Sequence, residues 1–177
     1  MTHIFAYPTQ HGTHPRIIYE LVRTTNCRSY LELGIYDGTC ITEIAKIVDK
    51  AVGVDIKKRH RHNNFEFIEK TTDDFFATNT SKFDIIFIDA DHNFESVKKD
   101  FENALKCLNN HGIILLHDTD PMQKYLLQPT YCGDSYKMIN YIKENHPELN
   151  FINLPISEAG LTIINKNNEQ RHIQFIQ

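Results

Sequence analysis

Short apolar runs alternate with amphipathic helical patterns along most of this chain. The runs occupy 28–34, 50–56, 64–70, 83–89 and 112–118, and helical spacing occupies 38–50, 71–79, 93–108 and 135–146. Apolar runs that are continuous, rather than alternating with polar residues, are typical of strands buried on both faces. The pattern therefore predicts an α/β fold with a mostly parallel sheet and helices on both faces.

The two ends of the chain extend this pattern. Thr13 and Pro15 predict the start of a further helix, with Thr13 as its cap. The last two strands are expected at 149–155 and 159–165, with no helix between them. Only an antiparallel connection suits so short a link, so the last strand should run against the others. A length of 177 residues suits a single domain over 1–177.

Composition excludes several classes of partner. The net charge of −4 makes nucleic acid an unfavourable partner, and no apolar run approaches the roughly 20 residues that span a bilayer. No signal peptide is visible and the four cysteines are scattered, so we expect a cytoplasmic protein. A basic cluster at 57–62 is interpreted as a solvated loop rather than a phosphate-binding patch.

Polar or acidic residues end all five of the first predicted strands. In an open α/β sheet, ligands bind beyond the carboxyl ends of the strands, near the point where strand order reverses. These residues should therefore surround one pocket; they are Glu32 and Gly34, Asp55, 71–73, 89–92, and His117 with Asp118.

The first turn, "ELGIYDGT", indicates the kind of ligand. It has two glycines but not the GxGxxG of a dinucleotide site, because Tyr36 stands where a close turn needs glycine. Glu32 and Asp37 beside the turn favour a cationic ligand over a phosphate. Asp55, at the end of the second strand, can accept both hydroxyls of a ribose. S-adenosylmethionine, with its sulfonium, ammonium and adenosine, meets these requirements.

Two stretches carry a specific resemblance. "YLELGIYDGTCITEIA" with "AVGVDI" resembles class I S-adenosylmethionine-dependent methyltransferases. "FIDADHNFESVKKDFENALKCLNNHGIILLHDT" is similar to the metal-dependent small-molecule and sugar O-methyltransferases, in the branch with macrocin O-methyltransferase-like and cephalosporin-biosynthesis-like proteins. The resemblance implies a Rossmann-like seven-stranded sheet with the last strand antiparallel. It also implies an N-terminal segment and helix over the site (1–27), a cofactor-binding half (28–118), an acceptor-side half (119–165) and a tail (166–177).

The resemblance also implies which residues bind the cofactor. Tyr36 is expected either to cover the methionine part or to lie on the surface, and Thr72 or Asp73 to bond the adenine amino group. Thr72 is also predicted to cap the helix that it begins. The full predicted set is Glu32, Gly34, Tyr36, Gly38, Thr39, Asp55, Ile56, Thr72, Asp73 and Asp89.

A divalent cation is implied at Asp89, His117 and Asp118. Oxygen ligands favour magnesium or calcium, and an imidazole ligand shifts the preference toward manganese, iron or zinc. In one alternative Asp91 and Asp118 bind the cation while His117 supports them; in another the acids only cap helices. His92, three residues after Asp89, is implied as the base that takes the acceptor's proton, or else it belongs to the start of the next helix.

The predicted reaction is methyl transfer from S-adenosylmethionine to a hydroxyl of a small molecule or sugar, with Asp89 and His92 as catalytic residues. The alternatives are a metal-independent methyltransferase for another acceptor and a non-catalytic cofactor-binding domain. The acceptor pocket is expected to come from the N-terminal segment, the loop 119–136 or a neighbouring subunit of a homodimer. Candidate acceptor contacts are Tyr7, His11, His14, Tyr131 and Asp134.

Overall fold

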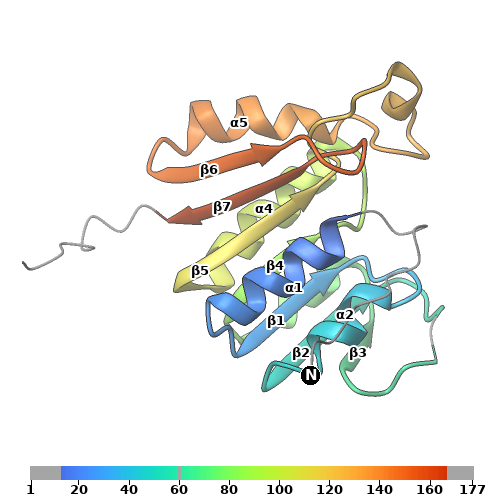
Figure 1. The fold of residues 1–177 in the computed structure, drawn as a ribbon, viewed down its shortest axis with the longest axis vertical. Helices are drawn as coiled ribbons and strands as arrows, with labels where there is room; N and C mark the ends of the chain where they lie inside the picture. The colour runs from blue at the N-terminus through green and yellow to red at the C-terminus, as the bar shows by residue number, and fades with distance from the viewer. Residues whose placement is uncertain (1–12, 60, 167–177) are drawn as a thin grey trace, which may run out of the picture.

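The computed structural model describes residues 13–59 and 61–166, and these form one seven-stranded sheet. The strand order is β3-β2-β1-β4-β5-β7-β6 (Figure 1). β7 pairs antiparallel with both β5 and β6, whereas the pairings among β1 to β5 are parallel, so the predicted reversal of the last strand is confirmed. The strands are β1 (Ser29–Leu33), β2 (Lys50–Asp55), β3 (Glu66–Glu69), β4 (Phe83–Ile88), β5 (Leu108–His117), β6 (Leu149–Leu154) and β7 (Leu161–Lys166).

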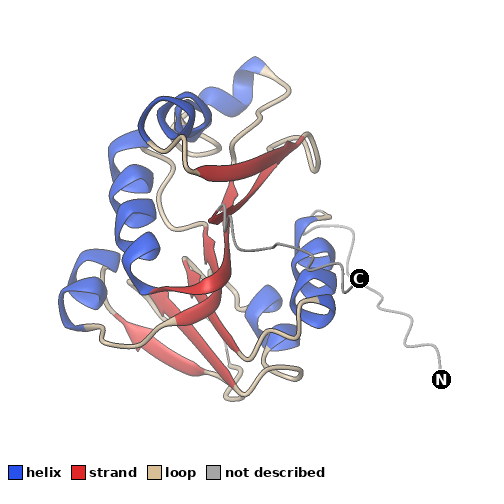
Figure 2. Ribbon diagram, turned by 90° about the vertical axis from the view of Figure 1, so that its left-hand side faces the viewer, coloured by secondary structure: helices blue, strands red, loops and turns tan. Residues whose placement is uncertain are grey.

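Helices cover both faces of the sheet, as predicted (Figure 2). Helices α1 and α2 bury Ile18 and Ile41 against one face, and α4 and α5 bury Phe101 and Ile142 against the other. Burying strand side chains on both faces is what requires continuous apolar runs. The helices are α1 (His14–Thr24), α2 (Thr39–Ile44), α3 (Thr72–Thr78), α4 (Phe94–Cys107) and α5 (Met138–Asn145), with 3-10 turns at Lys124–Leu127 and Ser135–Lys137.

Three element boundaries differ from the sequence predictions. Helix α2 ends at Ile44 rather than near residue 50, because the backbone N–H groups of Asp49 and Lys50 both bond to the Arg28 carbonyl as the chain enters β2. Strand β5 begins at Leu108, and a register shift against β4 accommodates the extra residues. The cap of α3 is Thr71, not Thr72.

The Thr71 hydroxyl accepts the N–H of Asp74 at 3.1 Å, which is the bond an N-cap residue makes. Thr13 precedes α1 as predicted, but its side chain makes no capping bond and instead lies 2.6 Å from the Ser157 hydroxyl. This contact ties the start of α1 to the loop before β7. Among the described helices, none is long and apolar enough to cross a membrane.

Candidate functional site

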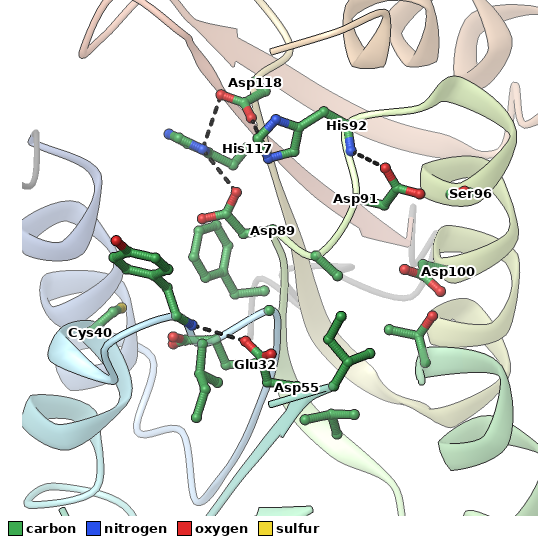
Figure 3. A pocket seen from close by; sticks show the side chains of 18 of the residues that line it. Glu32, Cys40, Asp55, Asp89, Asp91, His92, Ser96, Asp100, His117 and Asp118 are labelled. Carbon is green, nitrogen blue, oxygen red and sulfur yellow. Dashed lines mark hydrogen bonds and ion pairs between the residues drawn. The ribbon is translucent and has the colours of Figure 1, made fainter. Parts of the chain in front are cut away.

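A cavity of about 930 Å³ opens at the carboxyl ends of the parallel strands. It lies where strand order reverses, since the neighbours of β1 are β2 on one side and β4 on the other. The structure brings the predicted strand-end residues to this one cavity (Figure 3). Those that line it are Glu32, Gly34, Tyr36, Thr39, Asp55, Ile56, Thr72, Asp73, Asp89, His92, His117 and Asp118; Gly38 does not.

The turn after β1 crosses close to the end of β4. Gly34 has φ +82°, and a Cβ on it would overlap the carbonyl oxygen of Asp89. Only glycine meets both requirements, the positive φ and the close backbone approach. Gly38 also has a positive φ and precedes α2, so its role is to shape the turn. Tyr36 is 67% exposed and also lines the cavity.

Glu32 forms a buried floor beneath this turn. Its side chain is buried and Oε2 accepts a hydrogen bond from the Tyr30 hydroxyl at 2.6 Å. Burial raises the pKa of Glu32 to about 8, although the bonds from Tyr30 and Cys40 act in the opposite direction. The group is therefore largely neutral at pH 7 until a cation approaches it.

Asp55 at the end of β2 is already engaged on both oxygens. Oδ2 accepts the N–H of Tyr36 at 3.1 Å, and Oδ1 accepts from the Lys57 N–H at 3.0 Å and from Arg59 Nη1 at 3.1 Å. The Arg59 guanidinium also lies over the Tyr36 ring, 5.7 Å from its centroid. Arg59 lies in an exposed loop, as predicted, and also lines the cavity.

Two carboxylates and two imidazoles meet at the ends of β4 and β5. His117 Nδ1 lies 3.0 Å from Asp89 Oδ1 and 3.1 Å from Asp118 Oδ1 (Figure 3). Burial lowers the pKa of His117, but the two carboxylates outweigh it and raise the pKa to about 10. His117 is therefore a cation held between Asp89 and Asp118. His92 Nε2 lies 3.3 Å from the other oxygen of Asp118.

Three residues of this cluster lie close enough together to hold a metal ion, and they include His92 rather than the predicted His117. Asp89, His92 and Asp118 each offer a ligand atom within 4.8 Å of the others. His117 instead occupies the space between the carboxylates. Asp91, the alternative ligand, accepts the N–H groups of His92 and Asn93 at 2.7 and 3.2 Å and so shapes the turn before α4.

The cap of α4 is Asn93, whose side chain accepts the N–H of Glu95 at 3.0 Å. The side chain of His92 is thus not a cap. It is 29% exposed and lines the cavity between Asp91 and Asp118. This placement leaves the imidazole accessible to a small molecule in the cavity.

The far end of the cavity contains a residue that sequence reasoning missed. Thr72 and Asp73 line it from α3, and Asp73 pairs with Lys99 of α4 at 2.6 Å. Asp100, 3% exposed, also lines this end. The sequence feature that could have identified Asp100 is its position within the apolar stripe of α4, among Val97, Phe101 and Ala104.

The start of α1 and the segment after β5 complete the other side. His14 lines the cavity with its ring centroid 4.2 Å from that of His117, and Tyr131 lines it from the loop 119–136. Asp134 does not line the cavity; its carboxylate accepts the Phe94 N–H at 2.6 Å and pairs with Lys137 at 2.8 Å. The predictions for Tyr7 and His11 lie outside the described residues.

Comparison with known proteins identifies the family. The sequence model of a family described as a methyltransferase domain matches residues 9–119. No curated protein sequence matches this chain significantly. An O-methyltransferase from Bacillus cereus, solved with S-adenosylhomocysteine, superposes with a TM-score of 0.67 at 19% identity, covering 93% of this chain and 84% of that one.

Two further solved structures share the fold. The methyltransferase PaMTH1 from Podospora anserina, bound to S-adenosylhomocysteine, gives a TM-score of 0.68 at 18% identity over 88% of this chain and 78% of that one. The O-methyltransferase TomG from Streptomyces achromogenes, in complex with S-adenosylmethionine, gives a TM-score of 0.63 at 15% identity. The match covers 88% of this chain and 80% of that one. Because the family match spans more than half of the sequence and the fold is that of solved methyltransferases, this chain belongs to the methyltransferase-domain family.

Proposed function

We propose that this protein transfers a methyl group from S-adenosylmethionine to a hydroxyl of a small molecule, with a sugar among the candidate acceptors. The observation that carries the proposal is the convergence of Glu32, Asp55 and Asp89 on one cavity beside the Gly34 turn. Three carboxyl groups around an apolar-walled space suit a ligand that is cationic at one end and carries a ribose in the middle.

In this proposal, different residues of the cavity contact each part of the cofactor. The ammonium and sulfonium lie near Glu32 and the Gly34 turn, and the ribose hydroxyls lie at Asp55. Because Arg59 already occupies Asp55 Oδ1, ribose binding requires Arg59 to share that oxygen or move away. The base then extends toward Thr72. The remaining predicted contacts, Tyr36, Gly38, Thr39, Ile56 and Asp73, stay predictions.

The acceptor enters from the side of His14 and Tyr131 and reaches His92. Its oxygen attacks the methyl carbon in line with the sulfur, the carbon–sulfur bond breaks, and sulfur keeps the electron pair as a neutral thioether. The hydroxyl proton passes to the His92 imidazole, and Asp118, 3.3 Å from Nε2, stabilises the imidazolium that forms. The protein otherwise acts by orienting the two reactants.

The donor set at this centre fits a divalent cation. Either Asp89, His92 and Asp118 or the predicted set with His117 would hold it. Two carboxylates with an imidazole suit manganese, iron or zinc better than magnesium. Such a cation would lower the pKa of a bound acceptor hydroxyl. If His92 binds the cation it cannot also take the proton, so these two roles for His92 exclude each other.

One observation favours a metal-independent methyltransferase as the second candidate. The His117 imidazolium lies between Asp89 and Asp118, and so already supplies a positive charge to these carboxylates. A protein that balances these carboxylates with its own side chain has less need of a cation.

Calorimetry with S-adenosylhomocysteine and with NAD tests the shared basis of both candidates. We expect micromolar binding of the first and none of the second; equal affinity would refute the proposal. Methyl transfer to a panel of phenols, catechols and sugars, with and without a chelator, then separates the candidates. Binding without transfer to any acceptor would favour a non-catalytic cofactor-binding domain. A homodimer that completes the acceptor pocket, and a cytoplasmic location, stay predictions.

A further inference from the structure

A buried carboxyl group lines the cavity from α4, apart from the His117 cluster (Figure 3). Asp100 projects from α4 on the same side of the cavity as Ser96 and Asp91 (Figure 3), and its side chain is 3% exposed. Thr72, at the start of α3, lies across from it and also lines the cavity. The mechanism proposed above does not use Asp100.

Asp100 lacks a cationic partner within the protein. In the part of the chain that the structure describes, no lysine, arginine or histidine forms an ion pair with it, and the adjacent Lys99 directs its ammonium to Asp73 at 2.6 Å. Burial raises the pKa of Asp100 to about 6; the Thr72 side chain opposes this shift, and Asp73 and Asp91 add to it. A buried carboxyl group without a counter-charge is costly unless a donor reaches it. The Thr72 side chain already reaches it from α3, and the cavity is the open side from which a further donor can come.

The chemistry of that donor follows from the placement of the rest of the ligand. The cationic groups are accounted for near Glu32 and the ribose at Asp55, so a neutral N–H donor on the base remains. Adenine carries an exocyclic amino group with two N–H bonds. We propose that Asp100 selects the base of the cofactor, its carboxylate accepting a hydrogen bond from the adenine amino group with Thr72 beside it; this inference rests on the proposed function.

A cofactor analogue whose nucleobase carries an oxygen in place of the adenine amino group tests the proposed hydrogen bond directly. S-inosylhomocysteine, the deaminated form of S-adenosylhomocysteine, would direct a carbonyl oxygen at a carboxylate, leaving two acceptors facing each other without a donor. Sites that hydrogen-bond a ligand reject the analogue that lacks the bond because buried groups are left unpaired. We expect the wild-type protein to bind the adenine compound at least about 100-fold more tightly at pH 8.

The decisive variant is Asp100→Asn, which keeps the size of the side chain while its amide can accept or donate. We expect its preference for adenine to fall to within about 5-fold, with binding of the inosine compound improved. The matched control is Glu95→Gln, which removes another acid from α4 at an exposed position outside the cavity and should keep the wild-type ratio. Calorimetry measures both affinities, and thermal unfolding confirms that each variant is folded.

The outcomes separate this inference from the function on which it rests. If the wild-type protein binds neither compound, the proposed function fails. If it binds both equally, or if Asp100→Asn keeps the full preference, Asp100 does not select the base while the cofactor assignment stands. Loss of the preference in Asp73→Asn but not in Asp100→Asn would overturn the inference and assign the selection to α3. Should Asp100→Asn not fold, the wild-type ratio alone still decides whether the base is selected.

Discussion

The hydroxyl of Tyr30 donates a hydrogen bond to Glu32 Oε2 at 2.6 Å, and both side chains are buried, with Glu32 lining the cavity. The two residues lie on the same face of β1, because side chains two positions apart in a strand point the same way. Burial raises the pKa of Glu32 to about 8, so the charge of this carboxyl group depends on whether a cationic ligand lies beside it.

Cofactor binding should release a proton from Glu32. At pH 7 the group is mostly protonated in the free protein, and a nearby sulfonium or ammonium favours the ionised form and lowers its pKa. Calorimetry of S-adenosylmethionine binding in buffers with different ionisation enthalpies measures the release. We expect between about 0.5 and 1 proton at pH 7 and almost none at pH 9.5. A binding enthalpy independent of the buffer at pH 7 would contradict this.

Replacing Tyr30 by phenylalanine should weaken cofactor binding about 10-fold. The hydroxyl bond favours the ionised form of Glu32, so its loss raises the pKa further and makes the carboxylate harder to form when the cation arrives. The free energy of unfolding should fall by about 1 kcal/mol, the usual value of one hydrogen bond. The control is Tyr125→Phe, which removes an exposed hydroxyl bonded to Glu158 outside the cavity. An equal loss of affinity in both variants would count against the role of Tyr30.

Replacing Gly34 by alanine should abolish cofactor binding and destabilise the protein by more than about 2 kcal/mol. The added methyl group meets the backbone of Asp89 and Ala90, which directly follow β4 and are held in place by the sheet. Urea unfolding and calorimetry measure the two effects. A folded Gly34→Ala protein with unchanged affinity would show that the turn does not need glycine.

Replacing His117 by asparagine should make the protein respond more strongly to divalent cations. Without the imidazolium, Asp89 and Asp118 are left as neighbouring carboxylates with less positive charge between them. We expect manganese or magnesium to raise the melting temperature of the variant by several degrees more than that of the wild type. If EDTA and metal leave the variant and the wild type equally stable, His117 does not take the place of a cation.

The stability of the protein should depend on pH through Asp100. Its pKa rises from 3.8 to about 6 in the folded protein, so the folded state holds the proton more tightly than the unfolded state. The resulting stability is complete below pH 3.8 and is lost as the pH rises through 6. Asp100→Asn should therefore be more stable than the wild type at pH 8, by up to about 3 kcal/mol, and close to it at pH 4. Urea unfolding at both pH values measures the difference, and an equal difference at the two would contradict it.

Several features of the fold follow from local sequence alone. Continuous apolar runs such as 83–89 can be buried only in the middle layer of an α/β sheet, and the short link before β7 allows only an antiparallel return. Because parallel strands share one carboxyl edge, their terminal residues had to meet, and Glu32, Asp55 and Asp89 do so. These properties depend on neighbours in the sequence and on general rules of chain connection.

The partner of each side chain at that edge was decided only by the tertiary structure. Register between β4 and β5 sets His117 against Asp89, the loop after β2 carries Arg59 back onto Asp55, and the packing of α4 turns Asp100 toward the cavity. The sequence pattern identifies which residues end a strand or face the sheet. It does not determine distances of a few ångströms between groups that are distant in the chain, because those depend on how all the layers pack together.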